Sequence, residues 1–274
     1  MSSKLYNMST INKYIKPGLA IPLHTRIKVP GGWSTAGALK LNDLVVTPDG
    51  HHVPVTGIYP QGVTENYRFL FEDGRFAESH PLHQWAVYED SQSSLMVTTT
   101  LDILNHFSEF EYGIPLVGRV GNEAAELSDK ELIDIAHQLL TGVLTFSKVE
   151  ELNYEDRLTI ALTLIEYLDG VYTPEGVTLS ITLDTAAHAL RDLVRSLGGI
   201  VFVDGEEPFN LRILQRDIRN PLNLVEDTIH QKTRSLKLVG ITKDDPIETI
   251  CISIGNEDKL YIIGTYLVTH NGDC

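Results

Sequence analysis

Short apolar runs separated by turns dominate both ends of the chain. Runs of this kind are typical of strands, and Pro-Gly, Asp-Gly and similar turn signals lie between them. Several such strands close together predict a compact, mostly β unit. The expected strands before residue 120 are Thr25–Val29, Asp43–Val46, Val53–Ile58, Tyr67–Phe71, Trp85–Val87 and Met96–Thr98. Those near the C-terminus are Ser235–Val239, Glu248–Ile254, Leu260–Ile263 and Tyr266–Val268.

The middle of the chain has a different, helical periodicity. Ser128 followed by Glu131 forms a capping-box pattern before a helix that we expect to reach Leu140. Two further helices are predicted at Tyr154–Leu168 and Thr185–Leu197, with strands at Val177–Thr182 and Gly199–Val203. The chain therefore divides into 1–19, a β-rich half at 20–122, an α/β insert at 123–230, a second β-rich half at 231–271, and 272–274.

Composition and charge limit the possible functions. The 274 residues are 42% hydrophobic and 22% charged, as in an ordinary globular protein, and the formal net charge is −15. So acidic a chain disfavours a dedicated nucleic-acid binder. The two cysteines predict no disulfide framework, and no apolar run has membrane-spanning length. We expect a cytoplasmic monomer with no membrane partner.

The end of the chain carries the strongest chemical pattern, His270 followed by Asn271 and Gly272. An asparagine side-chain amide can attack its own carbonyl carbon, which closes a succinimide and cuts the backbone after the residue. A neighbouring imidazole can assist the proton transfers. The alternative is an Asn-Gly surface turn without chemistry.

Other candidates are ambiguous when taken singly. Cys251 lies in an apolar β pattern, so it is either a small core residue or a nucleophile that needs a nearby base or cation. Trp85 alone is more often a core residue, and Thr269 alone is an ordinary strand residue. A lone His83 is more often structural than catalytic.

Together these residues resemble a known family. Leu23–Ile27, Gly74–Trp85 and Thr269–Asn271 are similar to the motifs of inteins, the self-splicing elements of the hedgehog/intein (Hint) fold. That resemblance implies a mostly β, horseshoe-shaped Hint domain, split by the α/β insert. The element would run from Ala20 to Asn271.

The resemblance is to a particular group, the class 3 inteins of phage and phage-like genes. Ala20 cannot act as a first-residue nucleophile, and class 3 inteins use a Trp-Cys-Thr set instead, which Trp85, Cys251 and Thr269 match. The resemblance to class 3 inteins implies that Cys251 attacks the carbonyl of Leu19 and that Asn271 then cyclises. His83 would assist cleavage between Leu19 and Ala20. The host would be a bacterial or phage-infected cell.

The remaining roles also follow from the resemblance. His270 would assist Asn271, and His80 stands where the family has threonine, so it either provides a second polar contact or lines a turn. No cofactor is implied, because each step exchanges one acyl bond for another. The partners are the chain's own flanking (extein) segments.

The residue after Asn271 departs from the family pattern. Inteins require Cys, Ser or Thr there, whereas this chain has Gly272, with Cys274 two residues further on. We therefore predict cleavage without efficient ligation.

The insert resembles LAGLIDADG homing endonucleases at Leu168–Gly176 and Leu193–Ile200. In active members two packed helices each end in a carboxylate that binds a divalent metal. Glu175 is the candidate acid, and it follows a helix-breaking proline. No segment of the chain is a convincing match to the first of the two helix motifs that active members have. We expect a degenerate remnant that needs Mg²⁺ and DNA only if it is active. The alternatives for the whole chain are a site-specific DNA endonuclease and a splicing-inactive β-domain.

Overall fold

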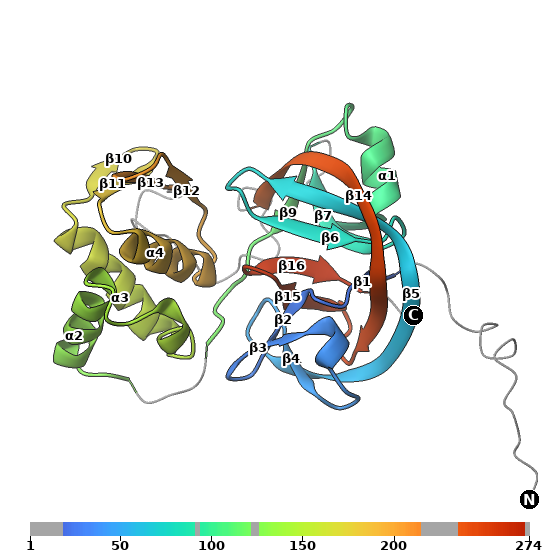
Figure 1. Ribbon diagram of the computed structural model, residues 1–274, viewed down its shortest axis with the longest axis horizontal. Coiled ribbons are helices and arrows are strands. Elements are labelled where there is room, and N and C mark those ends of the chain that lie inside the picture. The colour runs from blue at the N-terminus through green and yellow to red at the C-terminus, as the bar shows by residue number, and fades with distance from the viewer. Residues whose placement is uncertain (1–18, 91–93, 122–125, 215–234, 272–274) are drawn as a thin grey trace, which may run out of the picture.

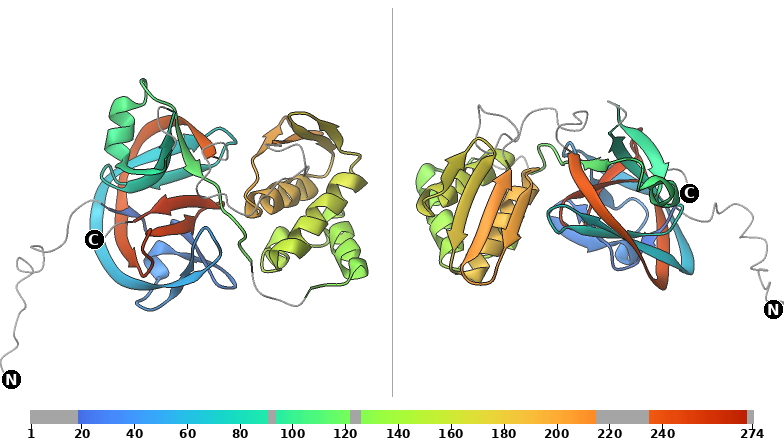
Figure 2. Two further views of the ribbon diagram at one scale, coloured as in Figure 1. Left: turned by 180° about the vertical axis from the view of Figure 1, so that it is seen from behind. Right: turned by 90° about the horizontal axis from the view of Figure 1, so that it is seen from above.

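The computed structural model of the chain describes residues 19–90, 94–121, 126–214 and 235–271 (Figure 1). The described residues are mostly β, with several sheets and four α-helices. They form two lobes that lie side by side in Figures 1 and 2. We call residues 19–121 and 235–271 the β lobe, and residues 126–214 the α/β lobe. The predicted boundaries of the insert, at residues 122 and 230, lie outside the described residues.

Two long antiparallel strands, β5 (His52–Phe71) and β14 (Ser235–Ile254), run through the β lobe. We predicted each of them as two short strands, which is wrong. The central residues of each strand are mostly polar, and the central parts of the two strands pair with one another. The pairing contains register shifts, one of them between Asp244 and Ile247. The eight-stranded sheet is completed by β1 (Ile21–Pro22), β4 (Leu44–Val46), β6 (Phe76–Ser79), β7 (Gln84–Glu89), β8 (Met96–Thr99) and β9 (Tyr112–Pro115).

A four-stranded sheet places the end of the chain inside the same lobe. Its order is β16 (Leu267–His270), β15 (Leu260–Ile263), β2 (Arg26–Val29) and β3 (Gly32–Thr35). Alternate apolar residues of both sheets face one another and form a common core. The core includes Ile27, Phe69, Trp85, Ile252 and Tyr261.

The α/β lobe has a separate core. Helices α2 (Asp129–Leu140), α3 (Tyr154–Tyr167) and α4 (Asp184–Ser196) confirm the three predicted helices to within one or two residues. Ser128 and Glu131 form the predicted contact, since the Ser128 backbone nitrogen donates to Glu131 Oε2 at 2.9 Å. The sheet of this lobe has β10 (Val171–Thr173), β11 (Gly176–Ile181), β13 (Phe209–Leu214) and β12 (Val201–Asp204), in that order.

One short helix of the β lobe was not predicted. Helix α1 (Thr100–His106) has only seven residues, too few for a clear apolar period. Its N-terminus is capped by Thr99, whose hydroxyl accepts a hydrogen bond from the Asp102 backbone nitrogen at 3.1 Å. Within the part of the chain that the structure describes, no helix combines the length and apolar character needed to cross a bilayer.

Candidate active site

The two predicted reacting side chains lie together in the core of the β lobe. Cys251 and Asn271 are both fully buried, and Cys251 Sγ lies 3.7 Å from Asn271 Oδ1. Cys251 comes from β14, whereas Asn271 follows β16 directly. The pairing of two sheets around one core therefore brings together residues that are 20 positions apart in the chain.

Backbone contacts fix the Asn271 side chain and the chain that bears it. The Asn271 side-chain amide donates to the carbonyl oxygen of Ile252, the residue after Cys251. The Asn271 backbone nitrogen donates to the carbonyl oxygen of Lys259 at 3.0 Å, which continues the β15–β16 pairing past the end of β16. Hydrogen bonds at both points restrict the rotation of the Asn271 side chain.

The register of β1 places the predicted N-terminal junction beside Cys251. Strand β1 pairs antiparallel with β14, with Ile21 opposite Ile250 and Pro22 opposite Thr249. One further step of this register sets Ala20 opposite Cys251. Ala20 is fully buried, and its carbonyl oxygen accepts a hydrogen bond from the backbone nitrogen of His80 at 2.9 Å. The junction between Leu19 and Ala20 is thus tied to both β14 and the segment that contains His80.

His83 connects that segment to the last strand. Its Nε2 lies 2.7 Å from Thr269 Oγ1, and both side chains are fully buried. The imidazole also contacts Trp85 edge-on, with ring centroids 5.1 Å apart. The contact between His83 and Thr269 spans 186 positions of sequence, and no local pattern could have predicted it.

Burial controls the ionisation of His83. Desolvation lowers its pKa from 6.5 to about 3, and the nearby Leu19 backbone opposes this shift only in part. Among the described residues, the buried His83 Nδ1 has no hydrogen-bond partner within bonding geometry. His83 is therefore neutral at neutral pH. One ring nitrogen of a neutral imidazole can accept a proton while the other donates one. Its neighbours are the Leu19 backbone and the Thr269 hydroxyl, so such a proton exchange can occur next to the predicted scissile bond.

Thr100 is a site residue that the sequence analysis missed. Its hydroxyl accepts a hydrogen bond from Trp85 Nε1 at 3.0 Å and lies 2.9 Å from Ser79 Oγ. Its backbone nitrogen donates to the carbonyl oxygen of His83 at 2.9 Å. Thr100 thus fixes both the Trp85 ring and the His83 backbone. No sequence signal identified it, because it lies in a run of three threonines with no chemical pattern.

The other two predicted histidines have different surroundings. His80 lies in a turn, where its Nδ1 accepts a hydrogen bond from the Leu82 backbone nitrogen at 3.1 Å. His270 is partly buried, and desolvation lowers its pKa, with a smaller opposing effect of Asp258. The described residues offer no hydrogen-bond partner to the buried His270 Nδ1.

Part of the predicted site lies beyond the described residues, namely Gly272 and Cys274. Cys251 is not a free thiol in this structure. The sequence had led us to expect a free thiol at this position. A nucleophilic role for Cys251 therefore requires reducing conditions.

Glu175, the candidate acid of the insert, is exposed in the turn between β10 and β11. It does not end a helix, since α3 ends at Tyr167, and the first acid after that end is Asp169. Asp169 has a φ of +50°, which places it in the left-handed region that often ends helices. Among the described residues, no three His, Cys, Asp or Glu side chains lie close enough to hold a metal ion.

Comparisons with known proteins gave structural but no sequence matches. No protein-family profile and no curated protein matches the chain. Solved structures of intein splicing domains align along most of it. The Msm DnaB1 intein splicing domain bound with zinc aligns with a TM-score of 0.40 and 12% identity, covering 92% of this chain and 99% of that one.

Two other inteins align similarly. The gp41-1 intein gives a TM-score of 0.38 and 12% identity, covering 92% of this chain and 98% of that one. A mutant of a Ssp DnaB mini-intein gives a TM-score of 0.42 and 9% identity, covering 93% and 99%. The chain is therefore structurally similar to intein splicing domains at low sequence identity.

Proposed function

We propose that this chain is a self-processing element that cuts its own backbone at two junctions, in the manner of a class 3 intein. The observation that supports this most is the convergence of Cys251, Asn271, His83 and Thr269 at one buried place beside Ala20. They come from three parts of the sequence: the segment that contains His83, strand β14, and the end of β16. A splicing-inactive β-domain gives no reason for them to share one site.

The first step is an acyl transfer at the N-terminal junction. The Cys251 sulfur, as thiol or thiolate, attacks the carbonyl carbon of Leu19 and forms a thioester. The bond from that carbon to the Ala20 nitrogen breaks, and the released amine gains the proton that the thiol loses. His83 is placed to transfer this proton, because it is neutral and lies at the Leu19 backbone. Trp85 and Thr269 hold the imidazole from two sides.

The second step is cyclisation at the C-terminal junction. The Asn271 side-chain nitrogen attacks the Asn271 backbone carbonyl carbon, and the bond to the Gly272 nitrogen breaks. The attacking amide loses a proton and the Gly272 amine gains one, with His270 as the neighbouring transfer group. The restricted Asn271 side chain lowers the entropy cost of ring closure.

Ligation is not part of the proposal. Gly272 has no side-chain nucleophile, so the acyl group on Cys251 cannot pass to it. Water or an added thiol releases residues 1–19 from the thioester instead. We also propose that residues 123–230 are a degenerate endonuclease insert and that the chain acts as a monomer on its own flanking segments.

Intact mass measured over time in the presence of a reductant tests the two junctions separately. Asn271→Ala is expected to block cleavage after residue 271 while residues 1–19 are still released. Cys251→Ala is expected to block release of residues 1–19. A product that joins residues 1–19 to 272–274 would contradict cleavage without ligation. A wild-type chain that stays intact would contradict the proposal as a whole.

A further inference from the structure

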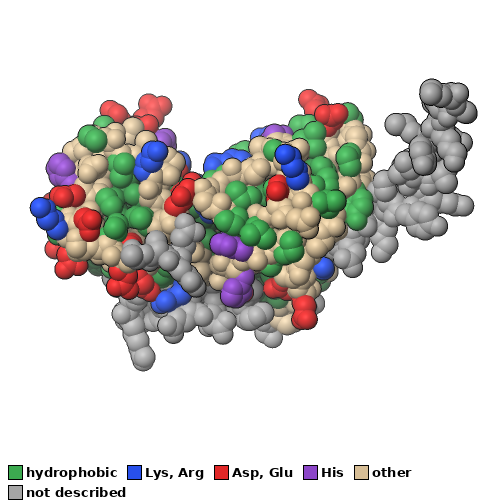
Figure 3. Space-filling model, turned by 90° about the horizontal axis from the view of Figure 1, so that it is seen from below, with side chains coloured by type: hydrophobic (Ala, Val, Ile, Leu, Met, Phe, Trp, Pro, Cys, Tyr) green, Lys and Arg blue, Asp and Glu red, His purple; other side chains and the backbone are tan. Residues whose placement is uncertain are grey.

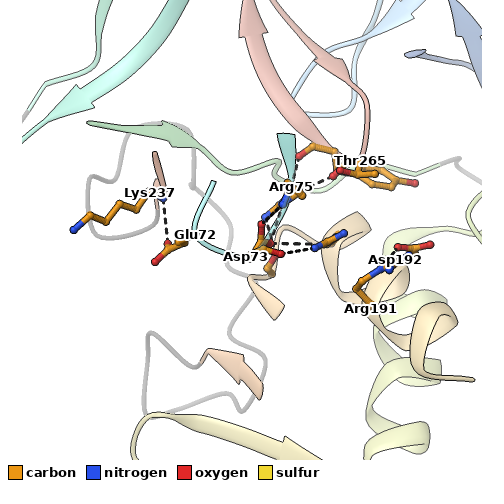
Figure 4. Close-up of polar contacts among 10 residues, drawn as sticks. Glu72, Asp73, Arg75, Arg191, Asp192, Lys237 and Thr265 are labelled. Carbon is orange, nitrogen blue, oxygen red and sulfur yellow. Dashed lines mark hydrogen bonds and ion pairs between the residues drawn. The ribbon is translucent and has the colours of Figure 1, made fainter. Parts of the chain in front are cut away.

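A buried group of charges joins the two lobes next to the predicted catalytic strand. Arg195 of α4 belongs to the α/β lobe, and its Nη2 donates to the Asp73 carbonyl oxygen of the β lobe at 2.8 Å. Figure 4 shows Asp73 beside Arg75. Arg195 Nε lies 3.6 Å from Asp73 Oδ2, and Arg75 Nε lies 2.9 Å from the same oxygen. The Asp73 and Arg75 side chains are fully buried, so the pairing is protected from solvent screening.

Arg75 extends this group to the turn before β16. Its Nη1 donates to the carbonyl oxygens of Thr265 and Tyr266, at 3.4 and 3.2 Å. Its Nη2 donates to the carbonyl oxygen of Gly199 in the α/β lobe at 3.4 Å. A single guanidinium therefore contacts both the α/β lobe and the turn that leads to Thr269 and Asn271.

A second polar group reaches the same turn from the α/β lobe. Glu150 Oε2 accepts hydrogen bonds from Trp33 Nε1 at 2.8 Å and from the Tyr266 hydroxyl at 3.3 Å. Lys28 Nζ lies 3.6 Å from the same oxygen. Both ends of Tyr266 are thus held: the carbonyl by Arg75 and the hydroxyl by Glu150. Tyr266 has a φ of +62°, a conformation that is costly for a tyrosine and needs support from its surroundings.

Strand β16 lies at the edge of its sheet, although its first three side chains are buried and the strand packs against β7 and β9. It has four residues, and within the described sheet it pairs with β15 alone. Because its backbone is hydrogen-bonded to one strand only, contacts at the preceding turn add to the forces that keep it from opening locally. Its far end carries Thr269, His270 and Asn271, so movement at the turn is transmitted directly to the site.

We infer that the α/β lobe holds the catalytic strand β16 in position through its contacts with the turn before that strand. We call these contacts the brace, and Arg195 and Glu150 are its positioning residues. The role assigned to β16 rests on the proposed function, but the brace itself does not. Without these contacts the β15–β16 hairpin opens more often. Cyclisation of Asn271 then slows more than the attack by Cys251, because Asn271 directly follows β16, whereas Cys251 lies on β14 and depends on β16 only through the contact of Thr269 with His83.

Hydrogen exchange tests the brace without requiring any reaction. The chain carries Asn271→Ala in every sample, so that cleavage after residue 271 does not complicate the comparison. Arg195→Gln is expected to speed exchange across residues 260–271 about tenfold, as loss of a charge-assisted hydrogen bond predicts. Arg191→Gln is the matched control, because Arg191 lies one turn earlier on α4 and its Nε donates to Asp192 of the same helix at 2.8 Å (Figure 4). It is expected to leave the exchange unchanged.

A milder pair keeps the test decisive if Arg195→Gln does not fold. Glu150→Gln removes the charge that Lys28, Trp33 and Tyr266 share, whereas Glu151→Gln changes its exposed neighbour. Faster exchange in residues 260–271 for Glu150→Gln alone supports the brace. Equal exchange in both variants, or faster exchange spread over all of the chain, overturns it.

The cleavage rates then connect the brace to the reaction. Without the Asn271→Ala change, Arg195→Gln is expected to lower the rate of cleavage after Asn271 about tenfold relative to release of residues 1–19. A purely structural defect lowers both rates together and contradicts the positioning role. If exchange changes as expected but no variant and no wild type cleaves, the proposed function fails while the brace stands.

Discussion

At the scale of single residues, the site combines side chains that local patterns could identify with others that they could not. Asn271 beside His270 is a recognisable chemical pair in the sequence. Only a family resemblance identified Cys251, Trp85 and Thr269 as candidates, because the pattern around each one alone is typical of a core or strand residue. Thr100 was missed altogether, since its importance comes from the partners of its hydroxyl and backbone nitrogen.

Thr100→Val tests the support that this residue provides. Valine has nearly the shape of threonine but leaves the buried Trp85 Nε1 without an acceptor, so we expect a loss of about 1–3 kcal/mol in the free energy of unfolding. Release of residues 1–19 should also slow. Thr100→Ser keeps the hydroxyl and is the matched control in urea unfolding and in the cleavage assay. Equal free energies of unfolding and equal cleavage rates for the two variants would show that the Thr100 hydroxyl does not support the site.

The pKa of His83 predicts a pH dependence of stability. In the folded chain this pKa is lowered from 6.5 to about 3, so on acidification the unfolded chain binds a proton that the folded chain does not. The free energy of unfolding should therefore decrease as pH falls from about 6.5 towards 3, and be unaffected by this group at higher pH. Urea titrations of wild type and His83→Gln measure the effect. The variant should show a shallower decline, and parallel curves would contradict the assignment.

At the scale of elements, the three helices of the α/β lobe were predictable, whereas the short helix α1 and the long strands were not. Helix α2 follows from its capping box and its apolar period, both of which are local. Strand β5 is continuous because its polar middle pairs with that of β14, about 180 positions away. Local alternation could not show that pairing. Asp169, the first acid after α3, was not selected, because the candidate acid was placed at Glu175, after the helix-breaking proline.

Two glycines allow the energetic cost of backbone conformation to be distinguished from the cost of close packing between elements. Gly198, after α4, has a φ of +80°, and a Cβ there would lie 2.3 Å from the carbonyl oxygen of Val117. Gly62 in β5 has a φ of +74° and open space around it. Gly62→Ala should cost about 1 kcal/mol in the free energy of unfolding, from conformation alone.

Gly198→Ala carries the same conformational penalty and a steric clash with backbone as well. We expect it to cost more than about 3 kcal/mol, which is in the range of severe core changes. Thermal or urea unfolding of the two variants side by side measures the difference. A similar cost for both would show that the contact between Gly198 and Val117 is not tight in solution.

At the scale of the whole molecule, two lobes with separate main cores are joined by polar contacts beside the site and by Ile200 of the α/β lobe, which packs in the core of the β lobe. Acidic side chains lie on the visible faces of both lobes, in keeping with the net charge of −15 (Figure 3). The division into a β-rich chain and an α/β insert could be predicted from periodicity. The contacts between the lobes could not, because they depend on how two separately folded units meet.

The central claim is that Cys251 forms a thioester with Leu19. Hydroxylamine, added to the reduced wild-type chain, cleaves thioesters and leaves a hydroxamate on the released acyl group. Mass spectrometry is expected to find residues 1–19 ending in a hydroxamate at Leu19, and to find none for Cys251→Ala. Release of that hydroxamate from Cys251→Ala, or its absence from the wild type, would contradict the account.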